Sequence, residues 1–447
     1  MDREKCLRFC REKKDFLRAG GTLYFIGIGG SGMYGLARLA YDLGYRVLGS
    51  DKSESENVKR LLACGISVTV GTESLPEELD AVVYSLAVDE EHPQRKEASE
   101  REMPTLSRAE LLGILMEGYP VRIAISGSHG KSSTVGMCAS ILTAYGLSPS
   151  VLIGADLSKE DGGYQRGAGN ILLTEACEYK DSFLSFSPTH AVVLNAEWDH
   201  TDYFPSRRSV LLSFSRFLEK ESISLRLVDD KTGLKAENRL GCATGFHIEN
   251  LTLKKGCPCF SVMKGREALA ELSLRVVGAH QAQNALAAFS LSYLMGVPVP
   301  VISDALSRYG GVGGRMEYRM DCHASPVYLD YAHHPTELRC AIESAREIGK
   351  RVVCVFEPHT YSRVSAFFLE LSAALRLADA VGVLPIYAAR EKNVYGVSAK
   401  KLAKASGGTY LPSFEAGADF LKKNAREDTV LLLAGAGLIA QTLRFMA

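Results

Sequence analysis

The residue types best suited to phosphate chemistry fall together in one segment of the first third of the chain: Gly127, Ser128, His129, Gly130, Lys131, Ser132 and Ser133. Glycines let the backbone turn tightly, so successive N–H groups and the start of a helix can point at one anion, which the helix dipole favours. Lys131 would place a mobile positive charge over nucleotide phosphates, and the Ser132 hydroxyl would bind Mg²⁺. The segment therefore predicts a phosphate loop.

The flanking pattern supports this prediction. A short β-branched run at residues 123–126 predicts a strand before the loop, and a helical pattern follows from Ser133 to about Tyr145. The spacing from Gly127 to Lys131 is shorter than in the strict phosphate-loop motif, which leaves an ordinary glycine-rich turn as the alternative. Because strand, glycines, lysine, serine and helix occur in the required order, we favour the phosphate loop.

Acidic side chains follow two further predicted strands. Glu175 ends the strand of residues 171–175, where α/β sheets gather their ligands, and we interpret it as a Mg²⁺ ligand. After the strand of residues 191–195 come three acids and a histidine, namely Glu197, Asp199, His200 and Asp202. Such a cluster suits a second metal or phosphate-contacting site. Solvated turn residues are the alternative for each acid, but the clustering favours a site.

The first part of the chain carries a second glycine-rich turn. A strand pattern from residue 22 runs into Gly27, Gly29, Gly30, Ser31 and Gly32, and a helical pattern follows. Asp51 ends the next predicted strand, about twenty residues on, where it could meet a ribose hydroxyl. This is the dinucleotide fingerprint. The same turn serves any pyrophosphate, so the motif leaves both NAD and a UDP-sugar open.

The last third of the chain predicts a second doubly wound sheet. Asn284 stands near the start of an Ala/Leu-rich helix, and residues 310–314 form a glycine-rich, hinge-like linker before Arg315. Strand patterns at 327–331, 351–356, 380–386 and 430–434 then alternate with helices. Polar residues cluster at the ends of these strands: Asp330, His333, His334, His359, Arg363, Arg390 and Glu391. Because they are far from the phosphate loop in sequence, we expect this domain to close onto the preceding one.

The composition bounds the kind of protein. At 447 residues the chain is too long for one hydrophobic core, so two or three domains are expected. Its 52 basic and 52 acidic residues balance, which argues against a nucleic-acid or membrane surface and favours small-molecule partners. The charged N-terminus and short first apolar run predict no signal peptide, and 11 scattered cysteines suit a reducing compartment, so we expect a cytoplasmic protein. The close pair Cys257 and Cys259 lacks partners at zinc-ligand spacing.

Taken together, these motifs resemble the Mur ligase family over essentially the whole chain. The resemblance is carried by Phe25–Met33, Gly49–Asp51, Gly127–Ser132, Glu175–Glu178, Asp199–His200, Asp330–Glu337, Pro358–His359 and Ala389–Lys392. It implies an α/β fold of three domains. These are a Rossmann-like UDP-sugar-binding domain at 1–118, a central P-loop-type ATP-binding domain with a mostly parallel sheet at 119–314, and a Rossmann-like amino-acid-binding domain at 315–447.

Within the family, the chain resembles most the members that join L-alanine to UDP-N-acetylmuramate. The resemblance implies ATP and Mg²⁺ as cofactors and places the UDP-sugar at the first glycine turn with Asp51. It implies that the phosphates and the metal are bound by Lys131, Ser132, Glu175 and His200. It places Asn284, Arg315 and Asp330 next to the nucleotide. The residues that it places facing the amino acid are His333, His359 and Arg363. No lysine follows Asp199 and His200 where sister ligases carry a carbamoylated one, which fits the alanine-adding branch.

The implied chemistry agrees with the residue types. A carboxylate is a poor electrophile, so amide formation needs ATP to convert it to an acyl phosphate, which an amine then attacks. The amine must be neutral when it attacks, and His333 or His359 is a candidate to orient or deprotonate it. Hydrogen-bonded packing at a strand end is the alternative for each histidine.

Three other functions stay open from the sequence. Within the family, a recycling ligase would join a whole peptide to the same sugar nucleotide. From another class, a nicotinamide-dependent oxidoreductase would use the first glycine turn and Asp51, but it would leave Lys131, Glu175 and His200 without a task. A non-catalytic nucleotide-binding protein would not need lysine, hydroxyl and carboxylate together. Both a monomer and a homodimer are compatible with the sequence.

Overall fold

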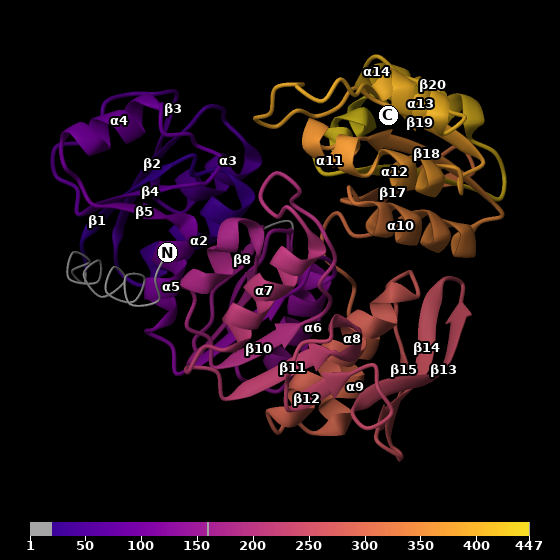
Figure 1. Cartoon of the computed structure of the whole chain (residues 1–447), viewed down its shortest axis with the longest axis horizontal. Coiled ribbons are helices and arrows are strands. Elements are labelled where there is room, and N and C mark those ends of the chain that lie inside the picture. Colours follow the sequence, from indigo (N-terminus) through magenta and orange to yellow (C-terminus); the bar gives the residue numbers. More distant parts are fainter. Residues whose placement is uncertain (1–19, 159–160, 447) are drawn as a thin grey trace.

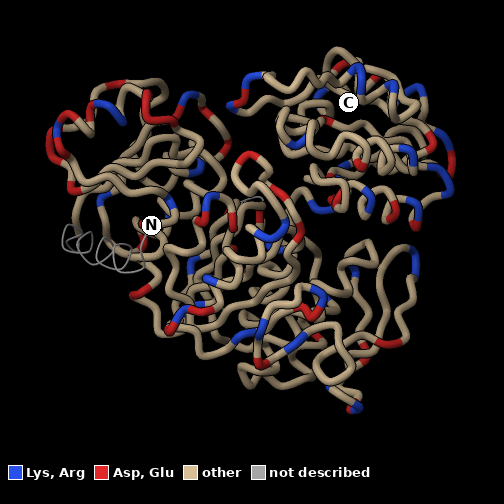
Figure 2. The backbone as a smooth tube through the Cα atoms, viewed as in Figure 1, with Lys and Arg blue, Asp and Glu red and all other residues tan. Residues whose placement is uncertain are grey.

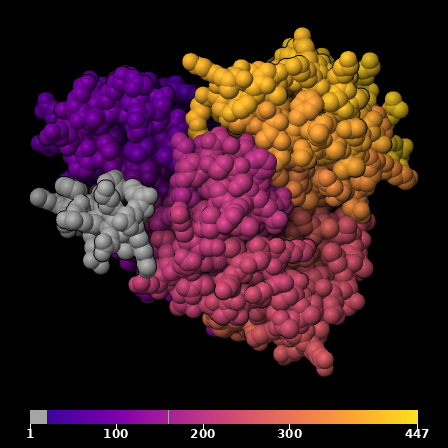
Figure 3. Space-filling view, in the orientation of Figure 1, coloured from indigo at the N-terminus to yellow at the C-terminus, as the bar shows by residue number. Residues whose placement is uncertain are grey.

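The computed structural model describes residues 20–158 and 161–446, and these residues form three α/β domains, each built on its own sheet (Figure 1). The first nineteen residues, which the sequence assigns to the first domain, lie outside the described residues. The expected three-domain α/β fold is confirmed. The central domain lies between the other two, and the space-filling view shows the C-terminal domain seated on it (Figure 3).

The first domain is a five-stranded parallel sheet in the order β3-β2-β1-β4-β5. Its strands are β1 Thr22–Ile26, β2 Arg46–Asp51, β3 Ser67–Val70, β4 Ala81–Tyr84 and β5 Thr105–Ser107. Its helices are α2 Ser31–Asp42, α3 Glu56–Ala63, α4 Pro93–Glu100 and α5 Arg108–Met116. The strand order reverses direction at β1, and the first glycine turn follows this strand. That is the point at which open α/β sheets bind ligands.

The central domain has a ten-stranded sheet in the order β15-β14-β13-β12-β11-β10-β6-β9-β7-β8. Its strands are β6 Val121–Ser126, β7 Ser150–Leu152, β8 Tyr164–Gln165, β9 Ile171–Ala176, β10 His190–Val193, β11 Leu225–Asp229, β12 Asn238–Leu240, β13 Phe246–Lys254, β14 Cys257–Lys264 and β15 Glu267–Ser273. In the order of the sheet, every pairing between β13 and β7 is parallel. The edge strands β8, β14 and β15 pair antiparallel with their neighbours. The mostly parallel sheet expected here is confirmed.

Helices cover this sheet, and one of them follows the phosphate loop directly. They are α6 Lys131–Ala144, η1 Tyr179–Ser185, α7 Arg207–Leu218, η2 Asp230–Thr232, α8 His280–Leu294 and α9 Val299–Arg308. The apolar cluster on one face continues into the first domain, so these two domains share a core. The opposite face packs against α6, α8 and α9. The strand that precedes the loop is thus fixed on both faces.

The C-terminal domain is a six-stranded sheet in the order β16-β17-β21-β18-β19-β20, parallel except for β16. Its strands are β16 Glu317–Cys322, β17 Ser325–Asp330, β18 Arg351–Glu357, β19 Ala380–Val383, β20 Thr409–Tyr410 and β21 Thr429–Gly435. Its helices are α10 Pro335–Ile348, α11 Tyr361–Ala366, α12 Phe368–Leu375, α13 Ala399–Ala405, α14 Phe414–Asn424 and η3 Ile439–Phe445. Apolar clusters fill both faces of the sheet.

Charged residues of both signs are interspersed along the described part of the chain. Lysine and arginine alternate with aspartate and glutamate over all three domains (Figure 2). In the described part of the chain, no helix combines the length and apolar character needed to cross a membrane. The nine described cysteines are free thiols, and Cys257 and Cys259 lie on β14.

Candidate active site

The phosphate loop joins β6 to α6 at the edge where the parallel strands end. Gly127 and Gly130 have backbone φ angles of 140° and 83°, which other residues rarely adopt. A Cβ atom on Gly130 would also clash with the Asn284 side chain. No side chain caps the start of α6. Its first N–H groups are therefore free to bind an anion, as predicted for a phosphate loop.

Lys131 lies folded back over this loop. Its ammonium group donates to the carbonyl oxygens of Gly127 and Ser128, and it lies 3.4 Å from Glu178 Oε2. Burial of the amine would lower its pKa, but the nearby negative charges, Glu178 first among them, together outweigh burial, and the pKa is raised. Lys131 is thus a permanent positive charge beside the helix start.

Two oxygen atoms predicted from the sequence to bind magnesium lie next to this lysine. Ser132 Oγ donates to Glu175 Oε1 at 2.6 Å, and the Gly154 N–H donates to the same oxygen at 3.0 Å. Glu178 is 2% exposed, and its Oε1 has no hydrogen-bond partner among the described residues. A buried carboxylate oxygen without a partner is costly, so these oxygens fit the ligand set that Mg²⁺ prefers.

The predicted third metal ligand, His200, lies on the far side of Glu178. Its Nε2 is 3.7 Å from Glu178 Oε1 and 4.0 Å from Asp199 Oδ2. The residue has a left-handed φ of 49°, which turns the chain sharply after the strand. The structure thus places Ser132 and Glu175 in direct contact, whereas His200 contacts Glu178, which lies beside Lys131.

The predicted nucleotide neighbours line one cavity of about 180 Å³ with the loop. Its walls include His129, Gly130, Ser132, Ser133, His280, Gln281, Asn284, Arg315, Asp330 and Glu337. Asn284 Nδ2 donates to Gln281 Oε1 at 3.0 Å, and the Arg315 guanidinium lies 5.1 Å above the Tyr331 ring. Amide and aromatic groups of this kind suit a purine base and ribose.

Asp330 has a structural task at this cavity. Its two carboxylate oxygens accept from the N–H groups of Met316 and Ala332, each at 2.8 Å. Burial raises its pKa to about 6. Asp330 therefore fixes the turn that carries Arg315 against the end of β17.

The amine-side candidates lie at the ends of β17 and β18. Arg363 makes a bidentate ion pair with Asp199 of the central domain, with Nε–Oδ1 and Nη2–Oδ2 distances of 3.0 and 3.2 Å. Its third nitrogen donates to His359 Nδ1 at 3.1 Å. The sequence led us to expect Arg363 facing the amino acid. In the structure two nitrogens of its guanidinium group bind Asp199, and the third contacts and positions His359.

Both histidines at this place are neutral at physiological pH. Burial lowers the pKa of His333 to about 4 and that of His359 to about 3, and neighbouring Arg363 adds to both effects. Their ring centroids are 5.8 Å apart. Neutral imidazoles can accept a hydrogen bond from an amine, but pKa values this low make them weak general bases.

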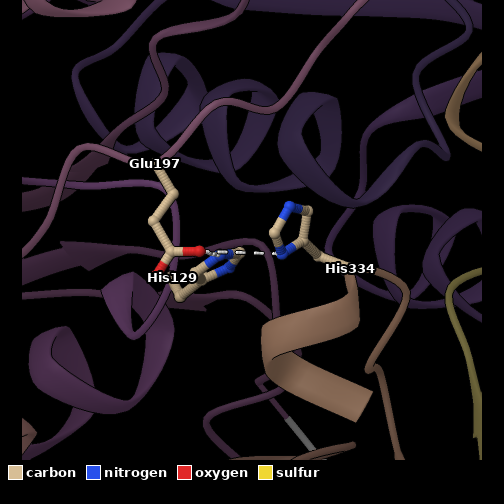
Figure 4. Close-up of side chains that lie close together, drawn as sticks. All are labelled: His129, Glu197 and His334. Carbon is tan, nitrogen blue, oxygen red and sulfur yellow. Dashed lines mark ion pairs between the residues drawn. The ribbon is translucent and has the colours of Figure 1, made fainter. Parts of the chain in front are cut away.

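A second set of contacts ties the phosphate loop to α10. His129 Nδ1 lies 3.1 Å from Glu337 Oε1, and His129 Nε2 lies 3.5 Å from Glu197 Oε2. Thr336 Oγ1 donates to Glu197 Oε2 at 2.7 Å, and His334 packs beside them (Figure 4). Burial of His129 would lower its pKa, but Glu337 and Glu197 raise it to about 9. Together with the Arg363 ion pair, these contacts join the central and C-terminal domains directly.

The first glycine turn has features that suit a second anion. Gly27 has φ of 73°, and the helix α2 begins after Gly30 without a side-chain cap. Asp51 Oδ2 accepts from the Gly29 N–H at 2.9 Å, so this acid also holds the turn in place. The Arg108 side chain runs beside Gly32. An uncapped helix start next to an arginine suits a pyrophosphate.

Several residues of the site were not assigned from the sequence. Glu337 occupies the third position of α10, where it also forms a capping box with His334. The capping-box pattern predicts a helix start, but it does not predict the contact of Glu337 with His129. Arg390 Nη2 donates to Tyr179 Oη at 2.5 Å, which adds another contact between C-terminal and central domains. Only the three-dimensional structure reveals these contacts, because the partners are about 200 positions apart in the sequence.

Three family models match the chain in sequence order. They are the Mur ligase family catalytic domain at residues 22–120, the Mur ligase middle domain at 125–292 and the Mur ligase glutamate ligase domain at 314–437. Similar proteins include the UDP-N-acetylmuramate–L-alanine ligases of Agathobacter rectalis, 36% identical over 440 residues, and Caldicellulosiruptor bescii, 37% identical over 440 residues. Each alignment covers 94% of this chain, with 96% and 97% of the respective relative.

Solved structures give the same comparison. A UDP-N-acetylmuramate–alanine ligase from Thermotoga maritima has a TM-score of 0.83 and 26% identity, covering 95% of this chain and 98% of that one. A murein peptide ligase from Psychrobacter arcticus has a TM-score of 0.72 and 20% identity, covering 96% and 99%. The second comparison shows a common fold.

Proposed function

The chain belongs to the Mur ligase family, and on that premise we propose that it joins L-alanine to the carboxylate of UDP-N-acetylmuramate at the expense of ATP. One observation carries the proposal. The phosphate loop with Lys131, Ser132 and Glu175 is joined through His129 to Glu337 at the start of α10, and Glu337 also contacts the strand-end histidine His333. Phosphoryl transfer and amine attack can therefore occur at one place.

The central domain would activate the carboxylate. ATP transfers its terminal phosphoryl group to the carboxylate oxygen, which gives an acyl phosphate and ADP. Lys131 and the uncapped N–H groups of α6 would stabilise the charge on the transferred group. Mg²⁺ supplies further charge neutralisation, and Ser132, Glu175 and His200 are the residues that would hold it.

The C-terminal domain would present the amine. A neutral amine of L-alanine attacks the acyl carbon, the C–N bond forms, and the bond to the phosphate oxygen breaks. His333, whose Nδ1 faces the Tyr331 carbonyl, would accept a hydrogen bond from the amine through Nε2 and orient it. His359, whose Nδ1 accepts from Arg363, would instead present its Nε2–H to the substrate. Because their pKa values of about 4 and 3 are too low to hold a proton near pH 7, the released proton passes on to phosphate or solvent.

The first domain would hold the sugar nucleotide. Its uncapped helix α2, glycine turn and Arg108 suit the pyrophosphate of a UDP-sugar. The proposed domain boundaries are 1–118, 119–314 and 315–447, and residues 309–316 link α9 to β16. A nucleotide-linked substrate and free thiols suit a cytoplasmic enzyme.

A ligase that adds a whole peptide is the nearest competing function. The experiment is ATP-dependent phosphate release with UDP-N-acetylmuramate, with L-alanine, other single amino acids or the tripeptide as the amine. We expect release with L-alanine and little with the tripeptide. Release with the tripeptide alone would overturn the proposed specificity, and nicotinamide reduction without phosphate release would overturn the ligase assignment.

A further inference from the structure

Three side chains from three separate segments converge beside the phosphate loop, as Figure 4 shows. They are His129 from the loop, Glu197 from the segment after β10, and His334 at the start of α10. One ligand atom of each lies within 4.8 Å of the others. His129 Nε2 and His334 Nδ1 lie 3.5 and 3.9 Å from the same oxygen, Glu197 Oε2. Here we call these residues the His-Glu-His cluster.

The two separations from Glu197 are near those that a bound metal ion requires, whereas the two histidine nitrogens, within 4.8 Å of each other, would have to move closer. Metal bonds of about 2.0–2.1 Å in a tetrahedral site place neighbouring ligand atoms roughly 3.3–3.4 Å apart. The side chains of His129 and His334 are only 12% and 5% exposed, whereas Glu197 is 42% exposed. Rotation of the two rings would complete the geometry, with His334 Nδ1 exchanging its hydrogen bond from the Thr336 N–H for the metal. The exposed glutamate leaves a route for entry.

The environment of His129 is that of a metal-ligating histidine. Its Nε2 is buried and makes no hydrogen bond with any described residue. Its other ring nitrogen, Nδ1, contacts the Glu337 carboxylate at 3.1 Å. A carboxylate on the far nitrogen fixes the ring orientation and increases the basicity of the ligating nitrogen, which is the usual outer support of metal-bound histidine.

The ligand set selects the kind of ion. Two imidazoles and one carboxylate suit Zn²⁺ and Co²⁺, whereas Mg²⁺ prefers oxygen ligands throughout. The cavity lined by His129, Glu197 and Thr336 leaves a fourth position open to water. The oxygen-rich set at Ser132 and Glu175 is separate in ligand type, so each place favours a different ion.

We propose that His129, Glu197 and His334 bind one zinc-class divalent ion at the nucleotide pocket, bridging the central and C-terminal domains. Such an ion links the phosphate loop to the start of α10 and holds the domains closed. Turnover requires opening for substrate exchange, so occupancy inhibits the enzyme. This site is additional to the proposed ligase activity and to its Mg²⁺. A proton on His129 competes for the same lone pair.

The test uses Co²⁺ as a visible probe on the full chain without nucleotide. One equivalent should give the intense visible absorption of a four-coordinate site, and excess Zn²⁺ should remove it. His334→Asn takes away the imidazole while keeping a side chain that caps helices well, and it should abolish this absorption. Glu337→Gln should weaken Co²⁺ binding about 10- to 100-fold, since it removes the carboxylate that supports His129, while the glutamine oxygen can still accept from the N–H groups at the start of α10.

Matched controls make the result decisive. Glu175→Gln, which alters the proposed Mg²⁺ place, should leave the Co²⁺ absorption intact. Thermal unfolding checks that each variant folds, and if His334→Asn fails, Glu197→Gln carries the test because glutamine can still accept from Thr336. The proposal is overturned if the unmodified protein gives no four-coordinate spectrum, if the cluster variants retain it, or if Glu175→Gln removes it.

The kinetic consequence has its own readout. Micromolar Zn²⁺ in the presence of excess Mg²⁺ should slow phosphate release by the unmodified enzyme, and His334→Asn should relieve this inhibition. Equal inhibition of both proteins would remove the regulatory role, whatever the spectra show. Absence of any ligase turnover would refute the proposed function and leave the spectroscopic test standing.

Discussion

The ion pair between Arg363 and Asp199 is the most buried link between the C-terminal and central domains described above. The two residues are 7% and 4% exposed, and the guanidinium fork meets both carboxylate oxygens. Burial alone would raise the pKa of Asp199, but Arg363 lowers it well below its usual range. Arg363→Ala would leave a buried carboxylate without its partner and loosen the support of His359.

The magnitude follows from this burial. Breaking a buried pair by removing one partner costs about 3–5 kcal/mol. If that cost falls on domain closure, the population of the closed form drops roughly 10²- to 4 × 10³-fold, since about 1.4 kcal/mol corresponds to a factor of ten. Uptake of a proton by Asp199 limits the loss, so we expect a fall in kcat/KM for L-alanine of about 100-fold.

The assay compares Arg363→Ala with a surface control. Arg346 pairs with Asp379 at 2.7 Å, and both side chains are more than a third exposed. Arg346→Ala should change kcat/KM little, because exposed pairs contribute about 0–1 kcal/mol. Phosphate release and thermal unfolding are measured for both variants. If Arg363→Ala keeps kcat/KM within about threefold of the unmodified enzyme, Arg363 does not hold the active arrangement.

Three further outcomes are expected. Lys131→Ala should lower kcat about a hundredfold or more with unchanged thermal unfolding, and near-normal turnover would remove this lysine from phosphoryl transfer. Gly130→Ala should weaken ATP binding at least tenfold, since its φ of 83° disfavours alanine and the Cβ would meet Asn284; normal ATP affinity by titration would contradict that reasoning. At saturating L-alanine, kcat should show no ionisation near pH 6.5 from His333 or His359, because protonation of these rings begins only near pH 4; an imidazole-like step that disappears on mutation of either ring would refute it.

Local patterns were sufficient to predict the phosphate loop and the position of Glu175 beside it. Strand, glycines and helix lie consecutively, so the position of Lys131 follows from chain order alone. Glu175 was predictable because parallel strands end at one edge of the sheet. The direct contact of Glu175 with Ser132 confirms that these two residues lie together. Their roles in binding ATP and metal stay predictions.

The interdomain contacts could not be predicted in this way. Arg363 and Asp199 are 164 positions apart, and His129 and Glu337 are 208 apart. Their pairing depends on how two separately folded domains dock, which no local periodicity encodes. The sequence placed Arg363 at a strand end and led us to expect it facing the amino acid, but it could not predict the pairing with Asp199. Nothing in the sequence predicted that Glu178 Oε1 would be buried. Position at a strand end was visible, but the partner was not.

Transfer of an oxygen atom tests the proposed chemistry most directly. UDP-N-acetylmuramate carrying ¹⁸O in both carboxylate oxygens is incubated with ATP, Mg²⁺ and L-alanine. The ¹⁸O content of the phosphate and amide products is then measured by mass spectrometry. An acyl phosphate predicts one ¹⁸O in each phosphate released and one ¹⁸O retained in each amide, because the bridging oxygen leaves with phosphorus. Phosphate without label, or an amide that keeps both labelled oxygens, would contradict carboxylate activation by phosphoryl transfer.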